Sequence, residues 1–187
     1  MKVMGTPCKK GLRMNADEKR SLLSGKKILI VDDEEDILDL LTELLDVCVL
    51  ERASSFEQAS ALLENNMYDA AVLDIMGVDG YGLLKIAESK NIPAIMLTAH
   101  ALTKEDLLRS IKEGASYYAP KDKINRIAEF ISDVLEARKM QKNIWARWFN
   151  SLGSYYDNRF GGADWREMEQ EFWEERLKDW DSDDPPT

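Results

Sequence analysis

Five side chains suited to metal and phosphate chemistry stand at the ends of short apolar runs. Asp32 and Asp33 end one run, Asp74 ends another, Thr98 ends a third, and Lys121 follows a fourth. Three carboxylates gathered in one place repel one another and raise each other's pKa, so such a cluster favours a bound cation. Carboxylate oxygens suit Mg2+, and the single histidine and two separated cysteines do not suit zinc. The pattern therefore predicts a magnesium site.

The other two side chains fit the handling of a phosphoryl group. The ammonium of Lys121 can neutralise one phosphoryl oxygen, and the hydroxyl of Thr98 can donate a hydrogen bond to another. A carboxylate can accept the phosphoryl group itself, and Asp74 is the candidate. The chain has neither a Walker loop nor a kinase glycine loop, so we expect the phosphoryl group to come from another protein or a small donor.

The elements that must position these residues alternate along the chain. Apolar, β-branched runs indicate five strands, and periodic apolar faces indicate helices between them. The strands are expected at residues 28–31, 47–50, 70–73 and 94–97 and around Tyr117; the helices at 36–45, 56–64, 81–89, 104–113 and from Lys123 onward. This alternation predicts an α/β fold with a doubly wound, five-stranded parallel sheet. Ligands of such sheets bind at the carboxyl ends of the strands, where the five side chains stand.

Four short motifs resemble those of bacterial response-regulator receiver domains, which have a flavodoxin-like fold. They are Val31-Asp32-Asp33-Glu34, Leu73-Asp74-Ile75-Met76, Leu97-Thr98-Ala99 and Pro120-Lys121. The resemblance covers about residues 26–138. It implies that Asp74 is phosphorylated by a histidine kinase or phosphotransfer protein.

The resemblance also assigns roles to the other matched positions. It implies that Asp33 and Asp74 ligate Mg2+, that Asp32 helps through a water molecule, and that Met76 lends its backbone carbonyl to the metal. Thr98 and Lys121 would bind the phosphoryl group. Thr98 and Tyr118 would form the switch that responds to it.

Two departures from the family pattern concern loops beside the site. The segment after Asp74, residues 75–80, is about two residues shorter than usual and lacks the familiar Met-Pro. Asp122 stands where the family generally has proline, so we expect a trans peptide bond and an altered loop around Lys121. Neither departure removes a reacting group.

The chain extends beyond the receiver at both ends. Residues 1–25 carry scattered basic residues without helical periodicity and are expected to form a flexible tail. Residues 139–187 form an acidic, tryptophan-rich extension. The last receiver helix is expected to run on through Trp145 and Trp148 until 150–153 interrupt it, and a second amphipathic helix is expected from Asp164. Its apolar face could pack on the receiver or on a partner.

Composition excludes several classes of function. The net charge of -10 opposes general DNA binding. No apolar stretch is long enough to cross a membrane, and two cysteines suit a reducing cytoplasm. We therefore expect a cytoplasmic single-receiver switch, with magnesium as cofactor, rather than a metabolic enzyme. Its output would pass through an unknown protein partner or a homodimer.

Two other functions are compatible with the same residues. One is a receiver that is never phosphorylated and serves as a scaffold, binding partners through its tryptophan-rich helices. The other is an aspartyl-phosphate hydrolase, which is disfavoured because Met76 stands where that mechanism needs an acid two residues after the nucleophile.

Overall fold

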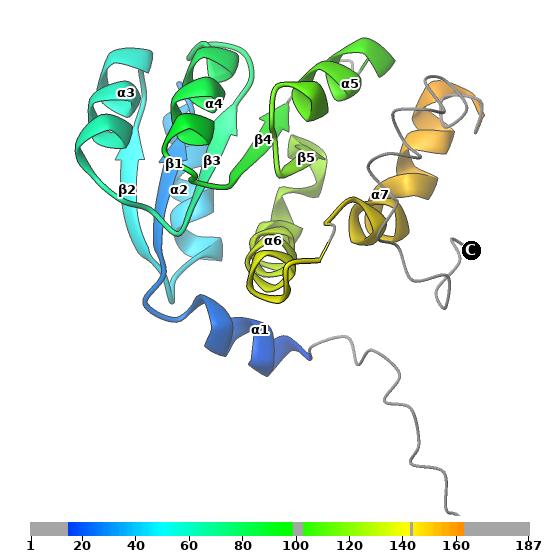
Figure 1. Ribbon diagram of the computed structural model, residues 1–187, viewed down its shortest axis with the longest axis horizontal. Coiled ribbons are helices and arrows are strands. Elements are labelled where there is room, and N and C mark those ends of the chain that lie inside the picture. Colours follow the sequence, from blue (N-terminus) through cyan, green and yellow to red (C-terminus); the bar gives the residue numbers. More distant parts are fainter. Residues whose placement is uncertain (1–14, 99–102, 143, 163–187) are drawn as a thin grey trace, which may run out of the picture.

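The computed structural model describes residues 15–98, 103–142 and 144–162, and these form a five-stranded sheet flanked by helices (Figure 1). The strands are β1 (Lys27–Val31), β2 (Val49–Ala53), β3 (Ala70–Asp74), β4 (Ala94–Thr98) and β5 (Tyr117–Pro120). All are parallel, in the order β2-β1-β3-β4-β5. This confirms the predicted doubly wound sheet.

Helices lie on both faces of the sheet (Figure 1). They are α1 (Ala16–Leu23), α2 (Glu35–Leu44), α3 (Phe56–Asn65), α4 (Gly80–Ser89), α5 (Lys104–Lys112), α6 (Ile127–Met140) and α7 (Ile144–Phe160). A 3-10 helix, η1 (Lys121–Arg126), joins β5 to α6. Helices α3, α4 and α5 cover one face, and α2 and α6 cover the other. No helix in the described segments is long and apolar enough to span a bilayer.

The central strands form because their side chains are apolar on both sides. Every residue of β3 and β4 is buried, as is all of β1 after Lys27. A parallel sheet covered by helices on both faces requires such continuous apolar runs. Strand β2 lies at the edge of the sheet and spans Val49–Ala53 instead of the expected 47–50. Most of its residues are exposed or half-buried. The edge strand tolerates Glu51 and Arg52 because only part of it is covered.

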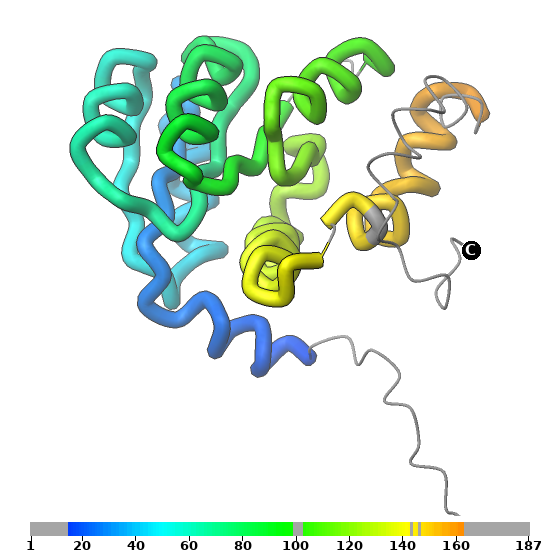
Figure 2. Tube along the Cα trace, in the orientation of Figure 1, coloured from blue at the N-terminus to red at the C-terminus, as the bar shows by residue number. Residues whose placement is uncertain are grey.

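The N-terminal segment differs from the expected flexible tail. Residues Ala16–Leu23 form α1, whose Asn15 side chain accepts a hydrogen bond from the backbone N–H of Glu18 at 2.9 Å. The Glu18 carboxylate accepts one from the backbone N–H of Asn15 at 2.8 Å, which completes a capping box. Leu23 is only 1% exposed, and α1 lies beside α6 (Figure 2). This helix is part of the packed fold.

The C-terminal helices also differ from the expected single long helix. Helix α6 ends at Met140, where Gln141 takes the left-handed conformation with φ of 53°, and α7 begins at Ile144. Helix α7 then runs through 150–153, where a break was expected, and ends before Gly161. The helix expected from Asp164 lies outside the described residues.

Helix α7 packs on the receiver through an aromatic face. It lies beside β5 and α6, at the edge of the sheet opposite β2 (Figure 1). Its buried side chains are Trp145, Trp148, Phe149, Leu152 and Tyr156. Burial of such large side chains on one side of a helix gives a strong apolar contribution to its docking. The aromatic face of α7 thus packs on the receiver, whereas the packing alternatives left open for the helix expected from Asp164 concern residues outside the described part of the chain.

Candidate functional site

The carboxyl ends of four strands meet at one edge of the sheet. Val31 of β1 pairs with Leu73 of β3, which directly precedes Asp74, and Thr98 of β4 pairs with Pro120 of β5. Parallel strands in this register bring the residues that follow them to the same edge. The expected site residues therefore converge, although they come from distant parts of the chain.

Asp32 and Asp33 follow β1 and differ in their exposure to solvent. Asp32 is fully buried, and its Oδ1 accepts a hydrogen bond from the backbone N–H of Glu34 at 3.1 Å. Its own backbone N–H donates to the carbonyl of Ala53 at 3.2 Å, which holds the turn against β2. Asp33 remains exposed. One carboxylate is thus fixed inside the site and the other lies at its mouth.

Asp74 completes a cluster of three carboxylates. Its side chain is 3% exposed, and one oxygen each from Asp32, Asp33 and Asp74 lie within 4.8 Å of one another. In the described part of the chain this is the group of acidic side chains with the geometry to hold a metal ion. This spacing would allow a metal ion to lie among the three carboxylates.

Lys121 enters the cluster from the end of β5. Its Nζ lies 2.7 Å from Asp32 Oδ2 and 3.0 Å from Asp74 Oδ1. It also hydrogen bonds Glu34 Oε1 at 2.9 Å. Its side chain is 9% exposed, so these contacts are shielded from water. The contact of Glu34 with Lys121 was not anticipated from the sequence, because nothing in its spacing distinguishes Glu34 from an ordinary acid at the N-terminus of a helix.

Burial and Lys121 have opposite effects on the pKa values of Asp32 and Asp74. Burial raises the pKa of Asp74 to about 6, and Lys121 opposes that rise. Burial likewise raises the pKa of Asp32, again against the lysine. For Lys121, burial lowers the pKa, but its contacts with the three acids outweigh burial and hold the pKa above its ordinary value. The lysine is therefore a fixed positive charge.

The donor set fits a hard divalent cation. Asp32 Oδ2 is buried and accepts no well-directed hydrogen bond; its contact with Lys121 is an ion pair only. One ammonium faces the carboxylates of Asp32, Asp74 and Glu34, with Asp33 beside them. The excess negative charge of this cluster is what a bound Mg2+ would compensate. The residues present thus fit the metal that the sequence predicts.

The loop after Asp74 is compact because two glycines allow close approach. A Cβ at Gly77 would lie 2.1 Å from Asp33 Oδ1, and a Cβ at Gly80 would lie 2.0 Å from the Asp74 carbonyl oxygen. Gly77 also has φ of +55°. The Met76 side chain is 65% exposed, and its carbonyl accepts a hydrogen bond from Val78 N–H in a tight turn. A carbonyl has two lone pairs, so one remains for a metal.

The two expected switch residues lie on neighbouring strands. Thr98 ends β4 and is 6% exposed. Tyr118 lies on β5 opposite Met96 and is fully buried, with its ring centroid 6.3 Å from that of Tyr156 in α7. Ala99, which follows Thr98, lies outside the described residues. The aromatic switch candidate is therefore packed inside the protein and touches the C-terminal extension.

The peptide bond that precedes Asp122 is trans, as expected from the absence of proline at that position. Asp122 opens η1 together with Lys121. Its Oδ2 accepts a hydrogen bond from the Tyr155 hydroxyl of α7 at 3.0 Å. The residue that departs from the family pattern is thus a contact point between the lysine loop and the C-terminal helix, which the sequence did not indicate.

Comparisons with known proteins agree with the geometry. Curated relatives include the heme response regulator HssR of Staphylococcus haemolyticus, 38% identical over 101 residues, covering 51% of this chain and 44% of HssR. The transcriptional regulatory protein CpxR of Klebsiella pneumoniae is 39% identical over 103 residues, covering 51% of this chain and 42% of CpxR. The chain therefore spans less than half the length of these relatives.

A solved structure, the receiver domain of the Francisella response regulator 1452, superposes with a TM-score of 0.55 at 27% identity. It covers 61% of this chain and 99% of that domain. The model of the response regulator receiver domain family matches residues 28–132, more than half of the chain. Together with the converging acids and lysine, this match establishes that the chain belongs to the response regulator receiver domain family.

Proposed function

We propose that Asp74 accepts a phosphoryl group from a histidine kinase or phosphotransfer protein in a magnesium-dependent transfer. Receiver domains of response regulators act in phosphorelay signalling, and the observation that carries the finer assignment is the placement of Asp74. Its buried carboxylate lies 3.0 Å from Lys121 Nζ and within 4.8 Å of two further carboxylates. That arrangement provides a nucleophile, a fixed cation and ligands for a metal.

In the transfer, an oxygen of Asp74 attacks phosphorus while the bond from phosphorus to the donor's imidazole nitrogen breaks. The product is an acyl phosphate, and the imidazole leaves with the electron pair of the broken bond. Lys121 neutralises charge on a phosphoryl oxygen, and Thr98 donates a hydrogen bond to another. Asp32, Asp33, Asp74 and the Met76 carbonyl would hold Mg2+, which neutralises charge on the transferred group.

The direct test is phosphorylation by acetyl phosphate with Mg2+ or with EDTA. We expect one phosphoryl group per chain, detected by intact mass spectrometry, only when Mg2+ is present. Peptide mapping should place it on Asp74, and hydroxylamine should remove it because acyl phosphates react with that nucleophile. A chain that stays unmodified under conditions that phosphorylate a known receiver would instead support the scaffold function.

The output is proposed to be a change in affinity for another protein. The net charge of -10 disfavours direct binding to nucleic acid. Phosphorylation would shift Thr98 and Tyr118, and Tyr118 is in contact with α7. We therefore propose that the partner-binding surface lies on the side of the molecule formed by β5, α6 and α7.

A glycine substitution tests the metal ligands without touching the phosphoacceptor. Gly77→Ala is expected to push the Asp33 carboxylate aside and weaken Mg2+ binding by about tenfold, the scale seen when a metal ligand loses its orientation. Isothermal titration calorimetry measures this affinity. Gly25→Ala is the matched control, because Gly25 also has positive φ but no atom within 4 Å of its added Cβ. Equal Mg2+ affinities for the two variants would contradict the assignment of Asp33.

A further inference from the structure

We propose that Trp148 and Tyr155 of α7 are positioning residues for Lys121. The inference rests on the proposed phosphoacceptor function and adds to it a role for a helix outside the family match at 28–132. Helix α7 contacts the chain on both sides of the lysine, through a backbone carbonyl before it and through side chains after it. In this way it keeps the ammonium at the carboxylate cluster.

The first contact lies on the strand before Lys121. The indole Nε1 of Trp148 donates a hydrogen bond to the backbone carbonyl of Tyr118 at 2.7 Å. Trp148 is fully buried, and its ring stacks on that of Tyr156 with centroids 4.9 Å apart. Within the described residues β5 is the last strand of the sheet and pairs only with β4, and α7 contacts it.

The second contact lies directly after Lys121. The Tyr155 hydroxyl donates to Asp122 Oδ2 at 3.0 Å, and Lys123 Nζ lies 5.2 Å from the centre of the Tyr155 ring. Asp122 and Lys123 are the second and third residues of the 3-10 helix η1, which begins with Lys121. One aromatic side chain of α7 thus contacts the two residues that follow the lysine.

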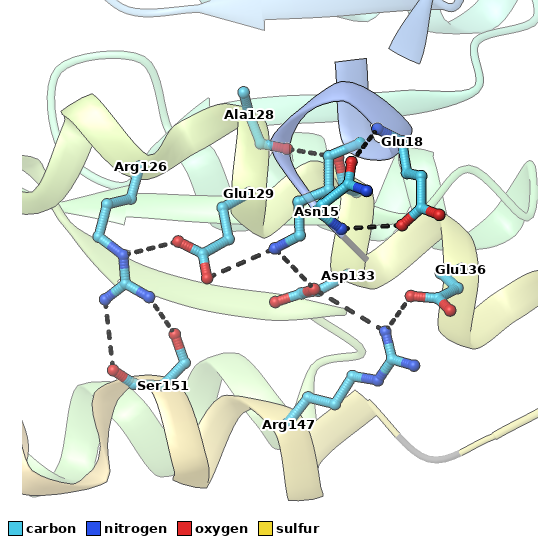
Figure 3. Close-up of polar contacts among 11 residues, drawn as sticks. Asn15, Glu18, Arg126, Ala128, Glu129, Asp133, Glu136, Arg147 and Ser151 are labelled. Atoms are coloured by element: carbon cyan, nitrogen blue, oxygen red, sulfur yellow. Dashed lines mark hydrogen bonds and ion pairs between the residues drawn. The ribbon is translucent and has the colours of Figure 1, made fainter. Parts of the chain in front are cut away.

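A third set of contacts fixes α7 itself (Figure 3). Arg126, at the end of η1, donates from Nη2 to Ser151 Oγ at 2.8 Å. Arg147 pairs with Glu136 and Asp133 of α6. The helix is therefore anchored both to the end of the lysine turn and to α6. It can serve as a rigid support instead of a mobile arm.

The physical reason for a positioning effect is the lysine's flexibility. A lysine side chain loses much rotamer freedom when its ammonium is fixed, and a mobile backbone adds to that cost. Contacts that restrain the residues before and after Lys121 lower the cost of placing its charge at the phosphoryl group. Coupling of this kind is reciprocal, so a bound phosphoryl group should also strengthen the docking of α7.

The test uses the full-length chain and the phosphoryl analogue beryllofluoride. Tyr155→Phe removes only the hydroxyl that binds Asp122 and is expected to weaken beryllofluoride binding about threefold to tenfold, as for the loss of one hydrogen bond. Its affinity for Mg2+ alone should not fall, because Lys121 is not a metal ligand. Tyr68→Phe is the matched control, since it also removes a hydroxyl bound to a carboxylate, that of Glu51, far from the lysine. It should change neither affinity.

Two further variants separate positioning from general loosening. Asp122→Asn keeps an acceptor for the Tyr155 hydroxyl and should bind beryllofluoride nearly as the native chain does, whereas Asp122→Ala should match Tyr155→Phe. Trp148→Phe should likewise bind beryllofluoride more weakly without losing affinity for Mg2+. If this variant does not fold, the Tyr155 and Asp122 variants alone test the positioning role.

The outcomes distinguish this inference from the proposed function. Equal beryllofluoride affinity in Tyr155→Phe and the native chain, or a parallel loss of Mg2+ affinity, overturns the positioning role alone. A native chain that binds no beryllofluoride through Asp74 overturns the phosphoacceptor function, and the positioning role falls with it.

Discussion

Asp74→Asn is expected to take no phosphoryl group and, in the absence of Mg2+, to be more stable than the native chain. The amide cannot form the acyl phosphate. It also removes one of the negative charges that lie within 4.8 Å of one another around a single ammonium. Relief of that repulsion should raise the free energy of unfolding by about 1–2 kcal/mol. Function and stability thus change in opposite directions.

The pH dependence follows from the raised pKa of Asp74. Burial raises this pKa from 3.8 to about 6, so the fold favours the neutral acid over the carboxylate. The unfolding free energy of the native chain therefore falls as pH rises through this window, and the asparagine variant lacks that loss. The higher unfolding free energy of Asp74→Asn relative to the native chain should be present at pH 7 and disappear below about pH 4.

Urea unfolding at several pH values, with EDTA, measures this difference. Asp46→Asn is the control, because Asp46 is an exposed acid that pairs with Arg20 on the surface. It should neither block phosphorylation nor show the pH-dependent gain. A loss of stability in Asp74→Asn at pH 7 would mean that the ion pair with Lys121 outweighs the repulsion among the acids.

Lys121→Met is expected to have the opposite effect on stability and to damage function severely. The lysine is the cation shared by Asp32, Asp74 and Glu34, and the first two side chains are 1% and 3% exposed. Removing one partner of a buried ion pair leaves uncompensated charge, at a cost of about 3 kcal/mol. Loss of a fixed charge at the transferred group should also slow phosphorylation by about 100-fold.

Magnesium provides a direct readout for this variant. Because Mg2+ also neutralises the cluster, it should restore part of the lost stability, and by more than it stabilises the native chain. Chemical unfolding with and without Mg2+ measures both the loss of unfolding free energy in the variant and the part that Mg2+ restores. Lys26→Met is the control: its pair with Asp69 is 37% and 35% exposed, so its loss should cost less than about 1 kcal/mol. A variant that Mg2+ does not rescue would argue against a metal in this cluster.

The central sheet could be predicted because its strands carry their signal locally. Residues such as Ile28 and Val72 belong to runs that are apolar on both faces, which a covered parallel strand requires. The edge strand β2 was placed two residues early, because Glu51 and Arg52 interrupt its apolar pattern. An exposed edge tolerates those charges, so its sequence is less distinctive.

The two end helices illustrate a different kind of error. The signal for α1 was present as Asn15 and Glu18 in capping-box spacing, but its charged residues concealed the amphipathic face. The break between α6 and α7 carries neither glycine nor proline; Gln141 adopts the left-handed conformation instead. A stripe that keeps helical spacing across such a turn cannot be distinguished from one long helix by sequence pattern alone.

At the site, residues that follow strands were identified because topology places them together. Contacts between side chains far apart in sequence were not. Glu34 reaches Lys121 across 87 positions, and Tyr155 reaches Asp122 across 33. Neither pair has a motif of its own. Only the packing of α2 and α7 against the lysine turn reveals them.

The acidic face of α6 also has a consequence for the order of folding. Its Glu129 and Asp133 pair with Lys19 of α1, and Asp133 also pairs with Arg147 of α7 (Figure 3). During synthesis α1 emerges more than a hundred residues before the helix that it packs on, so its docking must wait for a long loop to close. The amides of α1 should consequently gain protection from hydrogen exchange late in folding, in the same kinetic phase as those of α7.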